Sequence, residues 1–126
     1  MAVATPSFRL RTVCIDCADA HEMAAFYGRL LGWEVTASEP NWVLMRDPGG
    51  GTGLSFQGES EYRPPIWPET PNGQDKMLHL DIQVDDLDVA VARAVAAGAR
   101  IAPVQPQERV RVLLDPAGHP FCLFLD

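Results

Sequence analysis

In the first half of the chain, apolar and polar residues alternate along one stretch and then take up the spacing of an amphipathic helix. The alternation puts Ile15 on one face of a β-strand and Thr12 and Asp16 on the other. The helical stretch follows Asp19, whose carboxylate can cap it, and stops at Gly32. The elements predicted for this half are a strand at 8–17, a helix at 20–31 and strands near 33–37, 41–46 and 53–57.

The second half repeats this order of elements. The predicted elements are a strand at 77–85, a helix at 87–97 and strands near 99–104, 109–114 and 120–125. Asp19 has a counterpart 67 positions later at Asp86, and the Gly-rich turn at Asp47 has one 68 positions later at Asp115. Offsets this similar indicate a duplication, with a first module at 8–57 and a second at 77–126.

The connector between the modules, residues 58–76, has a composition of its own. Four prolines interrupt it, and Tyr62 and Trp67 lie among them. Proline supplies no backbone donor, so this segment is predicted to be an ordered loop rather than a strand. Two interpretations remain open: a stiff crossover between the modules, or a lid that lays Tyr62 or Trp67 over a pocket.

The overall composition fits one globular domain covering residues 1–126. The net charge of −7 argues against a nucleic acid or an anionic membrane as partner, since both require a basic surface. We find neither a signal peptide nor an apolar run of the roughly 20 residues that span a bilayer, and therefore expect a cytoplasmic protein. The three cysteines are expected to be reduced thiols.

Several motifs, taken in order, resemble one known family. They lie at 24–33, 65–68, 79–87 and 115–123. Together they are similar to the vicinal oxygen chelate superfamily, which includes glyoxalase I, bleomycin resistance proteins and extradiol dioxygenases, and within it to glyoxalase-like domains of the actinobacterial type. The resemblance implies an α+β fold. Two tandem βαβββ modules would form an open, barrel-like mixed sheet around a cleft, with the helices outside. It also implies a homodimer.

The resemblance further implies four positions at which enzymatic relatives hold a divalent metal. Matched to this chain, they are Thr12, Ser55, His79 and Cys122. Only His79 is of the expected type, Cys122 could bind as a thiolate, and hydroxyls are poor ligands for zinc or iron. We therefore predict neither a catalytic metal nor another cofactor; if a metal were present, His79 and Cys122 would bind it. His79 could instead be a hydrogen-bonded wall residue or a ligand-recognition residue.

The leading hypothesis is a small-molecule binding protein similar to bleomycin resistance proteins, with a ligand of unknown identity. The predicted ligand-binding residues are Thr12, Asp16, Trp42, Ser55, Gln57, Trp67, His79, Asp81, Gln83, Arg111, Cys122 and Phe124. The alternative is a metal-dependent lyase, isomerase or dioxygenase resembling glyoxalase I, in which His79 is a ligand and the candidate catalytic residue. A third hypothesis is metal-free acid–base catalysis by His79 with Asp81 or Asp16. His119 is predicted to brace its turn.

Overall fold

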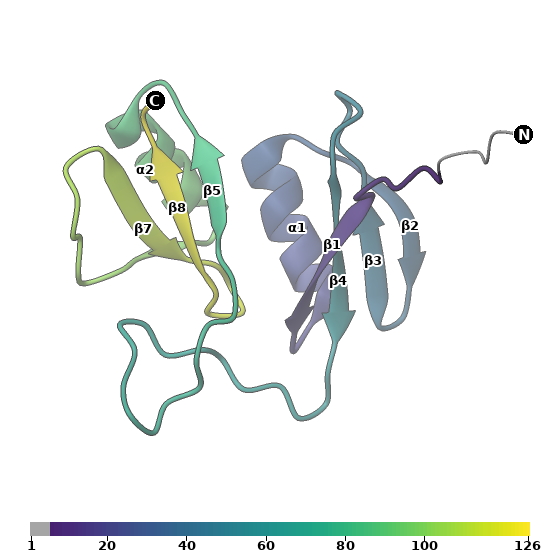
Figure 1. The fold of residues 1–126 in the computed structure, drawn as a ribbon, viewed down its shortest axis with the longest axis horizontal. Helices are drawn as coiled ribbons and strands as arrows, with labels where there is room; N and C mark the ends of the chain where they lie inside the picture. The colour runs from purple at the N-terminus through teal and green to yellow at the C-terminus, as the bar shows by residue number, and fades with distance from the viewer. Residues whose placement is uncertain (1–5) are drawn as a thin grey trace, which may run out of the picture.

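The computed structural model describes residues 6–126, whose helices and strands form two successive βαβββ modules (Figure 1). The first module contains β1 (Thr12–Cys17), α1 (Ala20–Leu31), β2 (Val35–Glu39), β3 (Trp42–Met45) and β4 (Gly53–Gly58). The second contains β5 (Leu80–Gln83), α2 (Leu87–Ala97), β6 (Arg100–Ile101), β7 (Val110–Leu114) and β8 (Pro120–Phe124).

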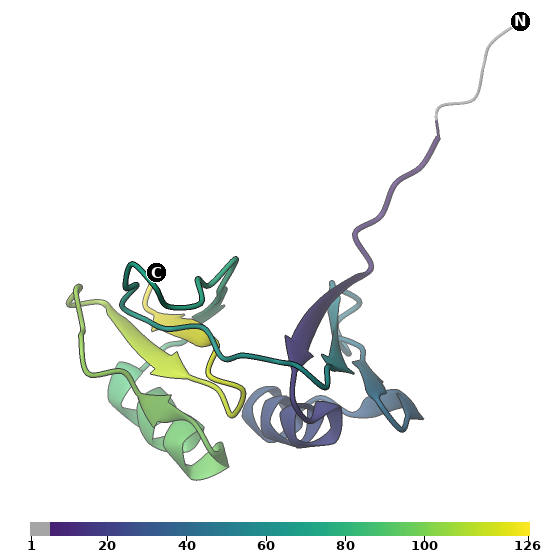
Figure 2. The same ribbon diagram turned by 90° about the horizontal axis from the view of Figure 1, so that it is seen from below.

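Each module builds a four-stranded mixed sheet with the same strand order. The orders are β1-β4-β3-β2 and β5-β8-β7-β6. The parallel pairs are β1 with β4 and β5 with β8. Both helices lie on one side of the sheets, and the connector runs along the other side (Figure 2). The predicted α+β fold of two βαβββ modules is confirmed, with two separate sheets in place of one continuous sheet.

Both helices begin and end where the sequence predicts. The carboxylate of Asp19 accepts hydrogen bonds from the first turn of α1, and Asp86 accepts one from the backbone nitrogen of Val89 in α2. Gly32 ends α1 with a φ of 74°, a conformation that favours glycine. In the part of the chain that the structure describes, neither helix is long and apolar enough to cross a membrane.

Three strands are at least four residues shorter than predicted, each for a local reason. Residues 8–11 lie outside β1 because its partner β4 begins at Gly53, opposite Thr12. His79 lies outside β5, beside the position of Pro120, whose nitrogen cannot donate to a ladder. The strand predicted at 99–104 is reduced to the two residues of β6, which pair with β7 before Pro103.

The two modules share one apolar core, centred on α1. Phe26 and Tyr27 are fully buried in this helix, and the Tyr27 ring stacks on Phe56 of the first sheet with centroids 5.5 Å apart. Phe26 also reaches the second module, where its ring lies 5.9 Å from Phe121. Burying each such ring contributes about 1.5–3 kcal/mol, so the shared aromatic cluster holds the modules together.

Candidate functional site

A cavity of about 540 Å³ lies between the two modules and beneath the connector. Cys14 and Asp16 of β1 line one side, while His79 and the residues around it line the other. Connector residues 59–63 and 74–76 complete the wall together with the turn before β8. The connector thus joins the modules and also borders the cavity.

A buried carboxylate supports the turn that precedes β8. Asp115 is 1% exposed, and its Oδ1 accepts hydrogen bonds from the backbone nitrogens of Ala117 and His119, both at 3.0 Å. Its Oδ2 accepts a 2.7 Å hydrogen bond from the Tyr27 hydroxyl of the first module. Burial raises the pKa of Asp115 above its ordinary value, although the hydrogen bond from Tyr27 and the nearby His119 act in the opposite direction.

The ring of His119 ties this turn to the first module and to the connector. Its Nε2 lies 2.6 Å from the backbone oxygen of Asp16 and 3.1 Å from the Tyr62 hydroxyl. The Tyr62 hydroxyl in turn donates to the backbone oxygen of Ala117 at 2.7 Å. His119 therefore connects three parts of the cavity wall, namely β1, the connector and its own turn. The sequence had predicted a contact within that turn alone.

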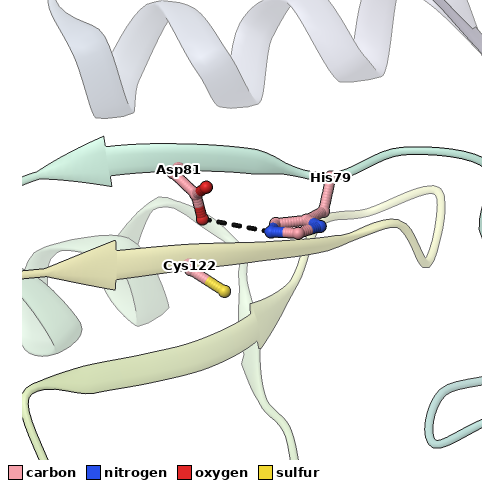
Figure 3. Close-up of side chains that lie close together, drawn as sticks. All are labelled: His79, Asp81 and Cys122. Atoms are coloured by element: carbon pink, nitrogen blue, oxygen red, sulfur yellow. Dashed lines mark ion pairs between the residues drawn. The ribbon is translucent and has the colours of Figure 1, made fainter.

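A second polar group lies beside the cavity, at the start of β5. Figure 3 shows the His79 ring turned toward the Asp81 carboxylate, with the Cys122 thiol on the neighbouring strand. The Nε2 of His79 is 3.1 Å from Oδ1 of Asp81, and one ligand atom from each of the three residues lies within 4.8 Å of the others. Burial, followed by the charge of Asp81, raises the pKa of the Cys122 thiol. These three side chains offer the nitrogen, oxygen and sulfur donors that zinc accepts.

The register of the second sheet separates the predicted site residues into two faces. Asp81 pairs with Cys122 and Gln83 pairs with Phe124, so these four residues share a face. Arg111 pairs with the buried Leu123 and therefore lies on the helix side of the sheet. Its guanidinium donates to backbone oxygens between residues 107 and 110. We accordingly leave Arg111 out of the candidate site.

The predicted residues of the first sheet share one face, and all of them except Asp16 lie outside the cavity lining. Ser55 is only 2% exposed, and the Gln57 amide donates to backbone oxygens of residues 41 and 58. Trp42 lies beside Gln57 in the register. The Thr12 hydroxyl receives a 2.7 Å hydrogen bond from Arg46. A guanidinium at this position disfavours a bound cation, so a metal site drawn from both modules does not fit this chain.

Of the predicted ligand-binding residues, Asp16 and His79 line the cavity, and Trp67 lies in the connector outside its lining. Sequence reasoning missed the contribution of three exposed connector acids, Glu59, Glu61 and Asp75. A loop has no periodicity that would reveal which side chains face inward. In the sequence, the negative charge of the connector was the signal that could have pointed to these acids.

Comparisons with known proteins agree with this architecture. The glyoxalase-like domain family matches residues 12–124. Among solved structures, a glyoxalase/bleomycin resistance protein/dioxygenase family enzyme from Burkholderia phytofirmans PsJN has a TM-score of 0.71 at 22% identity, covering 94% of this chain and 98% of that one. A glyoxalase/dioxygenase from Nostoc punctiforme has a TM-score of 0.66 at 22% identity, covering 100% and 97%.

TnmS3, an antibiotic binding protein from Streptomyces sp. CB03234, has a TM-score of 0.60 at 21% identity, covering 99% of this chain and 98% of that one. A search of curated proteins found no match in sequence. Likeness to solved structures at these identities shows a shared fold, whereas the family match covers nearly the whole chain. The protein therefore belongs to the glyoxalase-like domain family, whose structural neighbours lie in the glyoxalase/bleomycin resistance/dioxygenase group of the vicinal oxygen chelate superfamily.

Proposed function

We propose that this protein binds a small organic molecule in the cavity between its two modules, and that it does so in the cytoplasm. The observation that carries the proposal is the cavity itself. Its volume of about 540 Å³ falls within the roughly 300–1,000 Å³ typical of small-molecule sites. The three cysteines are free thiols, as expected for a reducing compartment.

The lining combines apolar walls with an excess of carboxylates. Its acids are Asp16, Glu59, Glu61 and Asp75, and its bases other than histidine are Arg63 and Lys76. Lys76 is already paired with Glu69 outside the lining. Such a wall favours a ligand with an apolar body and a cationic or hydrogen-bond-donating group. The antibiotic-binding neighbour supports a binding role for this fold.

The proposal is tested with three ligands that share an indole body: tryptamine (cationic), tryptophol (neutral) and indole-3-propionate (anionic). Amide shifts in NMR spectra of the labelled protein report binding and its location. We expect tryptamine to bind about two- to fivefold more tightly than tryptophol, because the carboxylates are exposed and screened. Indole-3-propionate should bind most weakly.

A matched pair of variants at Cys14 locates the site. Cys14→Phe places a bulky ring against the β1 wall of the cavity and should abolish binding, whereas Cys14→Ser keeps the volume and should retain it. If all three indoles fail to shift the amides of residues that line the cavity, the proposed binding function is wrong. Equal binding by Cys14→Phe and Cys14→Ser would place the site elsewhere.

The grouping of His79, Asp81 and Cys122 supports a second candidate, a metal-dependent lyase, isomerase or dioxygenase. These residues would hold the ion, and a bound metal supplies Lewis acidity toward substrate oxygens. The raised pKa of the Cys122 thiol opposes metal binding, which requires the thiolate.

Elemental analysis of protein purified without chelator tests this candidate. It predicts near-stoichiometric zinc, nickel or iron that is lost in His79→Ala and in Cys122→Ser. The control His21→Ala alters an exposed histidine of α1 and should retain the metal. Metal-free wild-type protein would remove this candidate and leave the binding proposal standing.

A further inference from the structure

The two sheets each place an edge strand beside the cavity. β1 and β5 stand at the ends of their sheets, and within residues 6–126 neither pairs with a strand of the other module. Each is the strand of its sheet nearest to the other module (Figure 1). An edge strand has backbone N–H and C=O groups without ladder partners. Such groups can bind a ligand that carries amide groups of its own.

The pairing of β1 with β4 determines which residues of β1 keep these groups unpaired. In a parallel pair, every second residue directs both its N–H and its C=O to the neighbouring strand, and the residues between direct theirs to the opposite edge. The nitrogen of Gly53 donates to the oxygen of Arg11, and the nitrogen of Glu59 donates to the oxygen of Cys17. The odd-numbered residues of β1 therefore bond to β4, and the even-numbered residues direct their backbone groups to the edge.

A contact at Asp16 shows where this edge faces. The C=O of Asp16 accepts a 2.6 Å hydrogen bond from Nε2 of His119, which belongs to the second module. Cys14 lies two residues earlier, so its backbone groups point in the same direction. Cys14, Ile15 and Asp16 all line the cavity, although side chains of consecutive residues point to opposite faces of a strand. The edge of β1 itself therefore forms this part of the cavity wall.

Three backbone groups of this edge have no protein partner among residues 6–126. They are the N–H and the C=O of Cys14 and the N–H of Asp16. Covering such groups without a partner is costly, so a ligand that packs against this edge has to supply hydrogen bonds. A ligand residue with an amide N–H and a C=O can donate to the Cys14 oxygen. Its C=O then accepts from the N–H of Cys14 or of Asp16, depending on the direction of the ligand.

We propose that the cavity takes a peptidic ligand, a small molecule whose amide N–H and C=O pair with the free edge of β1 as a short added strand. This inference rests on the proposed binding function and narrows it to one ligand class. The bond from His119 occupies the Asp16 oxygen and closes the ladder at that end. A cavity of about 540 Å³ admits a compound of dipeptide size rather than a long chain.

Two ligands that differ at a single group test the proposal. N-acetyl-L-tryptophan N-methylamide carries the required N–H and C=O, and its depsipeptide analogue has an ester oxygen in place of the tryptophan N–H. Isothermal titration calorimetry measures both affinities. We expect the amide to bind at least about tenfold more tightly, because the ester covers the Cys14 oxygen without donating to it. Equal affinities, or no binding of the amide, would overturn the inference.

Amide hydrogen exchange measured by NMR locates the bonds. In the ligand-free protein, the N–H of Cys14 and of Asp16 should exchange quickly, whereas the N–H of Ile15, which points to β4, should exchange slowly. A saturating concentration of the amide should slow exchange at Cys14 or Asp16 at least about tenfold. Unchanged exchange at both residues would overturn the inference.

The outcome for the peptidic ligand is separable from the outcome for the binding function. If tryptamine shifts the amides of residues that line the cavity and the tryptophan amide does not, the peptidic class is wrong and the binding function stands. If none of the indole compounds shifts them, both proposals are wrong.

Discussion

The Tyr27 hydroxyl of α1 donates a 2.7 Å hydrogen bond to the Asp115 carboxylate, across the boundary between the two modules. Both residues are almost completely buried, at 1% exposure each. Burial raises the pKa of Tyr27 well above its ordinary value, so the hydroxyl stays protonated and remains a donor. The same Asp115 holds the turn that carries His119 to the cavity wall. The Tyr27–Asp115 contact therefore links the packing of the modules to the geometry of the candidate site.

Tyr27→Phe should destabilise the protein by about 1–3 kcal/mol, because it leaves a buried carboxylate oxygen without its donor. Urea unfolding followed by circular dichroism measures the loss. Thr36→Ala removes a long, exposed hydrogen bond in β2 and should change the free energy of unfolding by less than about 0.5 kcal/mol. Equal stability of Tyr27→Phe and the wild type would show that the Tyr27–Asp115 contact does not help to hold the two modules together.

Asp115 should also shape the dependence of stability on pH. Its pKa is raised in the folded protein, chiefly by burial, so the fold favours its neutral form. Its contribution is therefore fully present below the unfolded pKa of about 3.9 and declines as pH rises through the raised folded pKa. The difference in unfolding free energy between the wild type and Asp115→Asn should shift against the wild type as pH rises from about 4 to about 7. A difference independent of pH would contradict the raised pKa.

The fold could be predicted because its signals are local and periodic. Alternation identified β1, the capping aspartates and Gly32 identified the helix ends, and the offset of Asp86 from Asp19 revealed the duplication. These signals depend on neighbours a few residues apart, which a sequence displays directly.

The candidate site was harder to predict because it depends on strand register and on a loop. Arg111 was predicted to line the cleft together with Cys122, but the observed register pairs Cys122 with Val112 and so turns Arg111 to the other face. The connector acids Glu59 and Asp75 reach the cavity through a path with no repeating pattern. His119 meets Asp16, which is 103 positions away in the sequence, and only the folded chain reveals that contact.

Thiol reactivity should differ among the three cysteines. Cys14 is exposed, whereas burial raises the pKa of Cys17 to about 12 and also raises that of Cys122. Since the thiolate is the reactive form, an aromatic disulfide reagent should label Cys14 first and leave Cys17 unlabelled in the folded protein.

The charge of Asp81 should suppress the reactivity of Cys122. In a Cys14→Ser background, Asp81→Asn removes a negative charge that raises the Cys122 pKa. The labelling rate of Cys122 should therefore increase about two- to tenfold. Asp88→Asn, at the start of α2, serves as the charge-matched control and should leave the rate unchanged. Stopped-flow absorbance distinguishes these outcomes. An unchanged labelling rate in Asp81→Asn would show that the charge of Asp81 does not influence the Cys122 thiol.

Gly118 should be more sensitive to substitution than Gly50, although both adopt left-handed backbone conformations with φ of 89° and 86°. A Cβ at Gly50 meets nothing within 4 Å, so Gly50→Ala carries only the backbone cost of about 1–2 kcal/mol. A Cβ at Gly118 would lie 3.0 Å from the Cβ of Pro64 in the connector, and this contact should add about 1 kcal/mol or more. Thermal and urea unfolding of the two alanine variants gives the difference directly.

If Gly118→Ala is no less stable than Gly50→Ala, the connector can move away from the turn at little cost. A larger loss in Gly118→Ala, relieved by the second change Pro64→Ala, would show that Pro64 packs firmly against the turn and fixes this part of the cavity wall.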